Sequence, residues 1–470
     1  MNELLTKLSL VRLDNPFAKL VQESFFLGPI IALLTALGQK LDKMSTAGLW
    51  LQKLSLLIVI LLYMVIGLPQ FAADKEGLAL ISLGAAGLYL LGRILGGNGR
   101  KVTCVDAAVG AYLAANCIAC LSSHYLAESI RGLSKVIIYV VSYFLLTSLF
   151  ANERKNIVLV VCAAILTGFL VSLYGLYQYK IGVAPLATWE DPNVESKGTR
   201  IYSTLGNPNL LAGYLLPLAP LSFGLGAALV TLKGKLRFLS LPVFTVCAVV
   251  SLAVFLTGSR GGYLAIAATG AFLFCALSYY LLAKRKNLIA PALIGSLVLG
   301  VLLICIVHFK MPAFEQRLLS IFAGSEHSSN AYRMNVWRAS MAMFKDNWWL
   351  GVGTGNTAFR LAYGLYMKSG FDALGTYCVP LEVGVETGIL GLASSGALLL
   401  LIFSRAHLIF WKQAGFYRFI ALGAAAALLG LMVHGLVDTV FYRPQVHLIF
   451  WLLISLLVAL SSQDEAPKAF

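Results

Sequence analysis

Charged residues are scarce in this chain of 470 residues. Asp, Glu, Lys and Arg make up 12% of it and 59% is hydrophobic, whereas soluble domains carry about 25% charged residues. This composition excludes a soluble protein and indicates an integral membrane protein. Acidic residues are the rarer sign, 21 against 36 basic ones. Basic cytoplasmic loops explain that excess in a membrane protein, so we expect no nucleic acid partner.

Metal-binding and familiar catalytic signatures are missing as well. The six histidines are scattered, and the chain has no HExxH, Walker, kinase or nucleophile-elbow motif. Cys117 and Cys120 form a CxxC with no second pair to complete a metal site. We therefore expect buried, inert thiols, no metal and no cofactor. The amino-terminal stretch also lacks the small-residue cleavage site of a secretory signal peptide.

Long apolar runs are what the chain has in their place. A membrane span needs about 20 apolar residues, and by that measure the sequence predicts an all-α, polytopic bundle of about 12 transmembrane helices. A further run at 25–38 is shorter, and it either lies in the interface or forms a thirteenth span. The predicted spans are 54–71, 77–95, 104–121, 136–150, 157–178, 208–231, 239–257, 262–283, 288–308, 387–410, 416–436 and 446–462.

Basic residues gather in alternate connections between these spans. Short loops of this kind belong in the cytoplasm, and the basic amino-terminal segment falls on the same side. We therefore expect a multi-pass protein with both termini in the cytoplasm. The basic loop residues are Arg93, Arg100, Lys101, Arg154, Lys155, Lys233, Lys235, Arg237, Lys284, Arg285, Lys286, Arg405, Lys412 and Arg418.

The order of spans and loops predicts five parts. They are an N-terminal cytoplasmic or interfacial segment (1–53), spans one to nine (54–308), a long external loop (309–386), spans ten to twelve (387–462) and a cytoplasmic tail (463–470). A structureless loop as long as 309–386 would be unusual. Within it, apolar residues recur at helical spacing, and two tryptophans suited to a membrane interface follow. We expect a helix that lies on the outer leaflet with Met334, Trp337, Met341 and Phe344 on its apolar face, opposite Asn335 and Lys345.

Arg260 is a candidate for binding an anion. It stands in the segment Thr257-Gly258-Ser259-Arg260-Gly261-Gly262, between two predicted spans on the outer side. An arginine there needs an anion, a water-filled cavity or lipid headgroups to offset its desolvation. The glycines permit close backbone approach, and Ser259 adds a hydroxyl donor. The alternative is that Arg260 simply reaches outer-leaflet headgroups.

Arg200 is a second candidate, shortly before Gly206-Asn207-Pro208-Asn209 at the start of a span. Asn207 is a natural N-cap, and Pro208 suits the first helical position. A helix amino terminus and a guanidinium that converge can bind an anion. A capped helix beside a solvated arginine is the other interpretation.

Further arginines lie on the same side. Arg333 and Arg338 fall on the predicted interfacial helix and Arg443 in an outer turn. They either contact lipid phosphates or join the others around one multiply charged anion. The segment Gly351–Asn356 resembles a phosphate loop but follows no strand and lacks the Walker lysine. We expect it to be a flexible turn that re-enters the bundle; the alternative is that its backbone amides bind an anion.

Two pairs of titratable residues share helix faces. Glu382 and Glu386 are four residues apart at the start of a span, so they either pair with an outer arginine or provide a general base. His434 and Asp438 have the same spacing. They are either a satisfied core histidine with its carboxylate or a proton-transfer pair.

As a set, these segments resemble the O-antigen ligase and polymerase superfamily of bacterial membrane proteins (Wzy_C-like). The matching pieces cover roughly residues 195–440. They are Arg200 with 206–209, then 257–262, Arg333 through Gly355, and 381–391. Within the superfamily, the segments 187–189, 202–212, 319–322, 353–359 and 379–383 resemble the branch described as IctB-like inorganic-carbon (bicarbonate) transporters.

The resemblance implies a GT-C-like glycosyltransferase of the bacterial cytoplasmic (inner) membrane. Such an enzyme transfers a glycan from an undecaprenyl-pyrophosphate carrier to an acceptor at the outer face, as in lipopolysaccharide or other cell envelope polysaccharide synthesis, without a metal. The resemblance further implies that Arg200 and Arg260 hold the pyrophosphate. In the ligases a histidine before the Leu-Glu pair is thought to activate the acceptor, and that position here is Tyr377.

A tyrosine with an ordinary pKa near 10 is a poor base at neutral pH. Tyr377 and Glu382 are nevertheless the residues of this chain predicted to lie near the acceptor. Two other functions stay open. The same arginines could attract bicarbonate in a transporter, or the chain could be a lipid-glycan-binding accessory protein that has lost its base.

Overall fold

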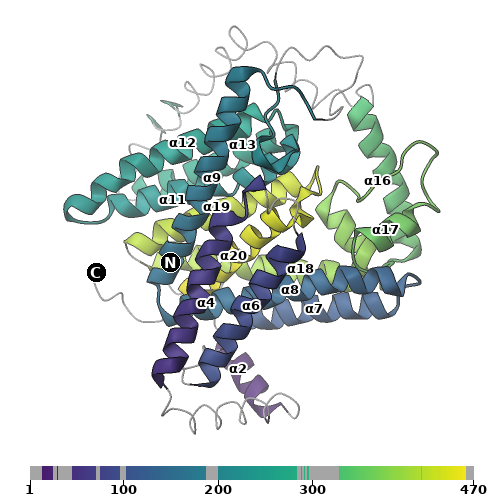
Figure 1. Cartoon of the computed structure of the whole chain (residues 1–470), viewed down its shortest axis with the longest axis horizontal. Coiled ribbons are helices and arrows are strands. Elements are labelled where there is room, and N and C mark those ends of the chain that lie inside the picture. Colours follow the sequence, from purple (N-terminus) through teal and green to yellow (C-terminus); the bar gives the residue numbers. More distant parts are fainter. Residues whose placement is uncertain are drawn as a thin grey trace.

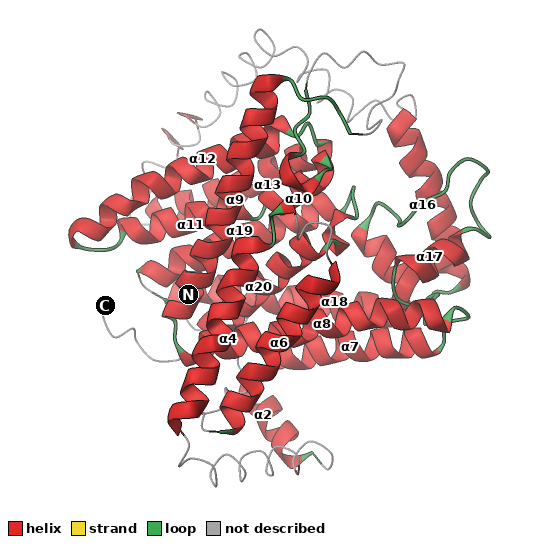
Figure 2. Cartoon of the chain, viewed as in Figure 1, coloured by secondary structure: helices red, strands yellow, loops and turns green. Residues whose placement is uncertain are grey.

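The computed structural model describes residues 13–24, 45–69, 75–95, 102–186, 199–282, 328–413 and 415–461, with positions 29, 287, 290, 291, 294 and 295 (Figure 1). All regular elements in these ranges are helical (Figure 2). The chain is therefore an all-α, polytopic membrane bundle, as predicted.

Eleven candidate spans within the described ranges are long and apolar enough to cross a membrane. They are α4 (Ser45–Val65), α6 (Lys75–Ile94), α7 (Cys104–Leu121), α8 (Leu126–Asn152), α9 (Lys155–Ile181), α10 with α11 (Pro208–Leu215, Leu218–Val230), η4 with α12 (Gly234–Leu239, Ser240–Leu256), α13 (Arg260–Leu282), α18 (Val379–Lys412), α19 (Phe416–Gly435) and α20 (Pro444–Ser461). The shorter elements are α2 (Asp14–Glu23), η3 (Ser203–Leu205), α16 (Ser328–Asp346), α17 (Asn356–Tyr363) and η7 (Val440–Tyr442).

These helices correspond to the predicted spans, with shifted boundaries. The predicted span 136–150 is part of the longer α8, whose first turns carry polar residues such as Glu128 and Lys135 that interrupt the apolar run. α18 begins eight residues before the predicted 387, and its backbone breaks at Gly388, where φ is 62°. The predicted ninth span (288–308) and the run 25–38 lie largely outside the described residues.

α20 forms the centre of the bundle. Every residue from Gln445 to Ser461 is buried, as expected for a helix that is apolar on all sides. Around it, α11 and α19 approach closely because glycines face each other. A Cβ atom on Gly224 would lie 2.6 Å from the carbonyl oxygen of Phe419 and 2.8 Å from the Cα of Gly423. Small residues allow such close contact between membrane helices.

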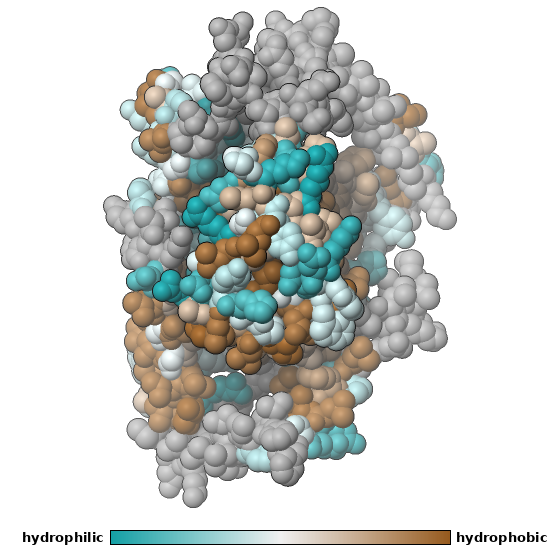
Figure 3. All heavy atoms as spheres, turned by 90° about the vertical axis from the view of Figure 1, so that its right-hand side faces the viewer, coloured by the Kyte–Doolittle hydropathy of each residue, from teal (hydrophilic) through white to brown (hydrophobic). Residues whose placement is uncertain are grey.

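The ends of the helices form two polar faces. At the face that we call the site end, α7, α9, α12 and α19 end and α8, α10, α13, α18 and α20 begin. α16 and α17 lie beside this end, at the right of Figure 1. Figure 3 shows this side with hydrophilic residues gathered in its middle above a hydrophobic band. The opposite face, which we call the basic end, carries the described members of the predicted cytoplasmic loops, such as Arg93, Arg154 and Arg418.

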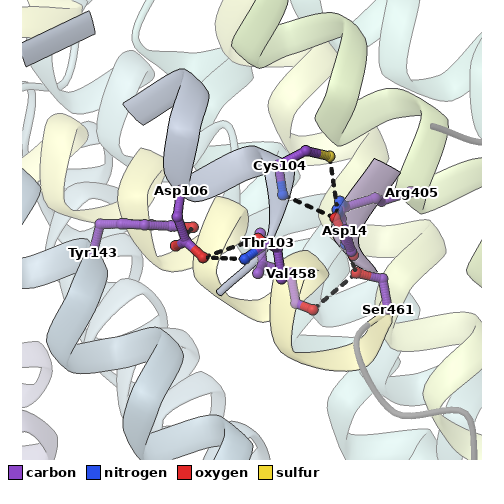
Figure 4. Close-up of polar contacts among 8 residues, drawn as sticks. All are labelled: Asp14, Thr103, Cys104, Asp106, Tyr143, Arg405, Val458 and Ser461. Carbon is purple, nitrogen blue, oxygen red and sulfur yellow. Dashed lines mark hydrogen bonds and ion pairs between the residues drawn. The ribbon is translucent and has the colours of Figure 1, made fainter. Parts of the chain in front are cut away.

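One predicted loop residue, Arg405, is placed differently. It lies inside α18, is 1% exposed, and forms an ion pair of 2.6 Å with Asp14 of α2 (Figure 4). Arg405 therefore does not contribute a solvated loop charge. The sequence pattern could not show this, because its partner lies almost four hundred residues earlier in the chain.

The predicted interfacial helix exists as α16, but its buried face was wrongly predicted. Val336, Ser340 and Met343 are its buried residues, and Met341 is 44% exposed. The helix packs on α17 and α18; for instance, a Cβ atom on Gly384 would lie 3.2 Å from the ring of Phe344. Contact with these helices, including the small Ser340, sets the buried stripe. The prediction from hydrophobicity alone placed the buried stripe about one residue away from its position in the structure.

Candidate functional site

Arg200 is held against the turn that joins α12 and α13. Its Nε donates a hydrogen bond of 2.9 Å to the carbonyl oxygen of Thr257. The backbone N–H of Ile201 donates to the carbonyl oxygen of Leu256 at 3.3 Å. Arg260 begins α13 directly after this turn. The structure thus brings Arg200 and Arg260 together at the site end.

The turn itself depends on Gly258 and Ser259. Gly258 has a φ of 66°, a conformation that glycine adopts without strain. Ser259 is 3% exposed, and its Oγ accepts a hydrogen bond of 3.3 Å from the N–H of Gly262. Ser259 therefore caps α13 and fixes Arg260 in the first helical position. Its predicted contact with an anion stays a prediction.

Asn207 caps α10, as predicted from the sequence. Its Oδ1 accepts hydrogen bonds from the N–H groups of Asn209 and Leu210 at 2.9 and 3.1 Å, and Pro208 takes the first helical position. The side-chain oxygen of Asn207 is therefore occupied by hydrogen bonds within its own helix. The side chain of the neighbouring Asn209 faces the site instead.

Asn209 connects Arg200 to Asp438. Its Oδ1 accepts a hydrogen bond of 3.1 Å from Arg200 Nη2. Its Nδ2 donates to Asp438 Oδ2, also at 3.1 Å. In the sequence, Asn209 is part of a motif and Asp438 a neighbour of His434, and neither has a predicted place beside Arg200. Only the folded chain brings these three residues together.

Arg333 reaches the same carboxylate from outside the bundle. Its Nη2 lies 3.5 Å from Asp438 Oδ2, with 21% of the Arg333 side chain and 8% of the Asp438 side chain exposed. The guanidinium carbon is also 5.8 Å from the centre of the Tyr377 ring, within the range of a cation–π contact. Arg333 therefore joins α16 to the cluster around Arg200.

The cluster has an excess of positive charge. Arg200, Arg260 and Arg333 are close enough to act electrostatically on one another, and Asp438 is the carboxylate in contact with the group. Burial lowers the pKa of Arg200 to about 10, and Arg333 adds to the effect while Tyr263 and Asp438 oppose it. Arg200 is therefore still a cation at neutral pH. Three guanidinium groups and one carboxylate leave a surplus that favours an anion with more than one charge.

Tyr377 stands beside these charges in an unusual conformation. Its φ is 55°, which is uncommon for a residue other than glycine. Burial, followed by the influence of Tyr332 and Asp438, raises the pKa of Tyr377 to about 12. The phenol is therefore neutral at physiological pH, and it is a weaker candidate for a base than an ordinary tyrosine. Its ring lies next to the guanidinium of Arg333.

Glu382 supports the segment that carries Tyr377. Its Oε2 accepts hydrogen bonds from the backbone N–H of Thr376 at 2.8 Å and from Thr376 Oγ1 at 3.3 Å. It is 3% exposed, and a Cβ atom on Gly375 would lie 2.7 Å from its carboxylate. The ion pair with an outer arginine, one of the two alternatives for these residues, is found neither for Glu382 nor for Glu386 among the described side chains.

The glycine-rich loop 351–355 is bonded to the bundle, and Val352, Gly353 and Thr354 in it are buried. The N–H groups of Val352 and Gly353 donate to the carbonyl oxygens of Val385 and Glu386 at 2.9 and 3.1 Å. The N–H of Thr354 donates to Ser129 Oγ at 2.8 Å. These amides therefore do not form a phosphate cradle.

The glycine loop thus bonds both to Ser129 of α8 and to the first turns of α18. It therefore fastens the segment between α16 and α18 to the bundle.

Two of the predicted arginines lie at the rim. Arg338 is exposed on α16, and five residues place it about 140° around the helix from Arg333. Arg443 is exposed where η7 ends. Within the described part of the chain, neither Arg338 nor Arg443 forms a hydrogen bond or ion pair with Asp438. Their roles as substrate ligands remain predictions.

His434 is buried close to the turn that carries Arg260. It is 2% exposed, and a Cβ atom on Gly261 would lie 3.3 Å from its Cδ2 and 3.5 Å from its Nε2. The imidazole fits there because positions 261 and 213 have no side chain. Within the part of the chain that the structure describes, Nε2 has no hydrogen-bond partner. Packing of His434 thus sets the distance between α19 and the first turn of α13.

Comparison with known proteins finds one family to which part of this chain is similar. Residues 245–395 match the family described as O-antigen ligase (Wzy_C). The match includes the α12–α13 turn with Arg260, helix α16 with Arg333, and the segment with Tyr377 and Glu382. This segment of the chain, about a third of its length, is thus similar to that family. None of the curated proteins matches the chain.

Proposed function

We propose that this protein transfers a glycan from an undecaprenyl-pyrophosphate carrier to an acceptor at the outer face of the cytoplasmic membrane. The observation that carries the proposal is the meeting of Arg200 and Arg333 around Asp438 and Asn209 at the site end, with Arg260 close enough to act on both arginines. The O-antigen ligase domain at 245–395 supports a lipid-linked glycan as the substrate class. Both termini would then lie in the cytoplasm, at the basic end.

In this proposal Arg200 and Arg260 bind the diphosphate of the carrier. Each presents a cation at neutral pH, and Arg200 is held rigidly by Thr257 and Asn209. A guanidinium fixed in this way can stabilise charge that develops on a leaving group without reorganising. Ser259 keeps Arg260 in the first turn of α13, and Asn207 keeps Asn209 in place. Arg338 and Arg443 would contact lipid phosphates or the glycan at the rim.

The transfer step is a displacement at the anomeric carbon of the glycan. The acceptor hydroxyl oxygen forms a new bond to that carbon, and the bond between the carbon and the phosphate oxygen breaks. The electron pair of the broken bond leaves with undecaprenyl diphosphate, next to the arginines. The proton of the hydroxyl must pass to a base.

Asp438 is the carboxylate that we propose as this base. It is the one in contact with both Arg333 and Asn209, and hence with the network of Arg200. Glu382 and Tyr377 were the sequence candidates for this region. We now propose positioning roles for both, because Glu382 is bonded to Thr376 and Tyr377 is a neutral phenol beside Arg333.

The test combines lipid analysis with a cellular readout. Mass spectrometry of lipids that co-purify with the natural chain should detect undecaprenyl diphosphate or its glycan-linked form. Replacement of Arg260 by alanine should remove that lipid and abolish one surface glycan in the host, with bicarbonate uptake unchanged. Lys345→Ala, at an exposed position of α16, is the matched control that should change neither.

The same experiment distinguishes the two other functions. Normal surface glycan with impaired bicarbonate flux in reconstituted vesicles would establish transport and refute transfer. A polyprenyl lipid that is bound by the natural chain but never turned over would establish a lipid-glycan-binding accessory protein.

A further inference from the structure

The amino-terminal helix α2 (Asp14–Glu23) is anchored to the basic end of the bundle through one buried charge. Asp14 Oδ1 accepts hydrogen bonds from Arg405 Nη2 at 2.6 Å and from the backbone N–H of Cys104 at 2.8 Å (Figure 4). The second nitrogen of the guanidinium, Arg405 Nη1, donates to Ser461 Oγ at 2.8 Å. The carboxylate therefore ties α2 directly to α7 and α18, and through Arg405 to α20.

The anchor fixes the depth of α2 relative to the bundle. Cys104 is the first residue of α7, and Ser461 is the last residue of α20. Arg405 lies seven residues before the end of α18 at Lys412, which is about 10 Å along a helix axis. α2 therefore begins level with the ends of these three spans. Figure 1 shows it beside the ends of α4 and α6 at the lower edge of the molecule.

α2 has two distinct faces. Leu13, Phe17, Leu20 and Val21 follow helical spacing on one side. On the opposite side lie Asn15, Lys19, Gln22 and Glu23, all of them exposed.

The apolar face is only partly covered by the protein. Phe17 and Val21 are half-buried against the bundle. Leu13 and Leu20 are 43% and 66% exposed, and no residue of α2 is fully buried. Leu13 and Leu20 thus form an exposed apolar edge of α2.

We propose that α2 lies in the plane of the membrane surface at the basic end, with Leu13 and Leu20 inserted among phospholipid acyl chains. The depth set by Asp14 and the apolar edge at that depth together select a phospholipid leaflet as the partner. The polar face carries Lys19 and Glu23 as an i,i+4 pair 3.7 Å apart, so its charges cancel. Insertion of apolar side chains, rather than attraction to anionic headgroups, provides the contact.

The Asp14–Arg405 pair gives the helix its orientation. A buried guanidinium in an apolar span is costly unless an opposite charge accompanies it, and Asp14 supplies that charge. The pair therefore couples the seating of α2 to the packing of α18, which also carries Glu382 and Glu386 at its other end.

Photocrosslinking in the full chain tests the proposal. The crosslinking amino acid benzoylphenylalanine is introduced at Leu20 or, as a matched control one half-turn away, at Gln22. The protein is reconstituted in vesicles of phosphatidylethanolamine and phosphatidylglycerol, irradiated, and analysed by peptide mass. We expect phospholipid adducts at position 20, several-fold more than at position 22, and the same yield when phosphatidylglycerol is omitted.

Equal yields at the two positions, or covalent dimers of the chain at position 20, would overturn the proposal. The role of the Asp14–Arg405 ion pair is tested with Asp14→Asn in the chain that carries benzoylphenylalanine at position 20. This change should lower the adduct yield. Asp14→Glu keeps the charge and should restore it. A yield that Asp14→Asn leaves unchanged would show that the Arg405 pair does not orient α2.

Discussion

Arg333 and Asp438 form an ion pair of 3.5 Å that links α16 to the turn after α19. The same carboxylate oxygen accepts a hydrogen bond from Asn209, which in turn holds Arg200. Helix α16 and the bundle are thus joined through the carboxylate that counterbalances the arginines. Any anion that binds there must compete with Asp438 for Arg333.

Replacement of Asp438 by asparagine separates binding from turnover. Loss of the negative charge frees Arg333 and Arg200 for an anion, so undecaprenyl diphosphate should bind the variant at least as tightly as it binds the natural chain. If Asp438 accepts the acceptor proton, the transfer rate should fall about 100-fold or more. Isothermal binding and single-turnover transfer measure the two effects. A parallel loss of both would refute the role of Asp438 as base.

Replacement of Arg333 by alanine should weaken diphosphate binding about tenfold, since a charge-assisted hydrogen bond contributes about 1.5–3 kcal/mol. Lys345→Ala removes an exposed positive charge from the same helix and should leave the affinity unchanged. Equal effects of the two changes would mean that only the net charge of α16 matters.

The two asparagines of α10 should behave differently. Asn207→Ala removes the helix cap and should destabilise the protein by about 1 kcal/mol, seen as a lower melting temperature in detergent. Asn209→Ala keeps the cap but releases Arg200 and Asp438, so it should reduce diphosphate affinity more than stability. The opposite pattern would contradict the assignment of Asn209 as the positioning residue.

Gly132 of α8 is predicted to be essential for seating the glycine loop. A Cβ atom there would lie 2.1 Å from the carbonyl oxygen of Thr354, so Gly132→Ala must displace the loop and should cost more than about 2 kcal/mol. In the paired helix α7, a Cβ atom on Gly110 would meet no other atom within 4 Å. Gly110→Ala should therefore be neutral or stabilising by up to about 1 kcal/mol. Thermal unfolding compares the pair.

The pH dependence of transfer tests the state of Tyr377. Its pKa is raised to about 12, so it stays protonated and neutral throughout pH 6–9. Because the folded protein holds this proton more tightly than the unfolded chain does, the contribution to stability is present below pH 10 and is lost as the pH rises toward 12. Tyr377→Phe should leave the shape of the rate profile between pH 6 and 9 unchanged. A rate that rises with pH in the natural chain and not in the variant would instead identify Tyr377 as a base.

Much of the bundle could be predicted from the sequence, because span length and apolar composition are local properties. The same is true of the Asn207 cap, which needs only its own next three residues. Contacts between distant segments could not be predicted. Asp438 finds Arg333 and Asn209, and Arg405 finds Asp14, only after the chain has folded.

Two errors show how local patterns mislead. The glycine loop 351–355 has the composition of a flexible turn, but its amides bond to residues of α8 and α18 that no local rule could pair with it. Glu382 has the position expected of a partner for an arginine, yet the nearby backbone N–H of Thr376 satisfies it.

The most direct test of the central claim is the affinity of the reconstituted protein for undecaprenyl diphosphate, measured for the natural chain, Arg200→Ala, Arg260→Ala and the double variant. If two guanidinium groups bind one diphosphate, each single change should lower the affinity about tenfold or more. The free-energy effect of the double change should then differ from the sum of the two single effects. Unaltered affinity in both single variants would contradict a diphosphate site formed by Arg200 and Arg260.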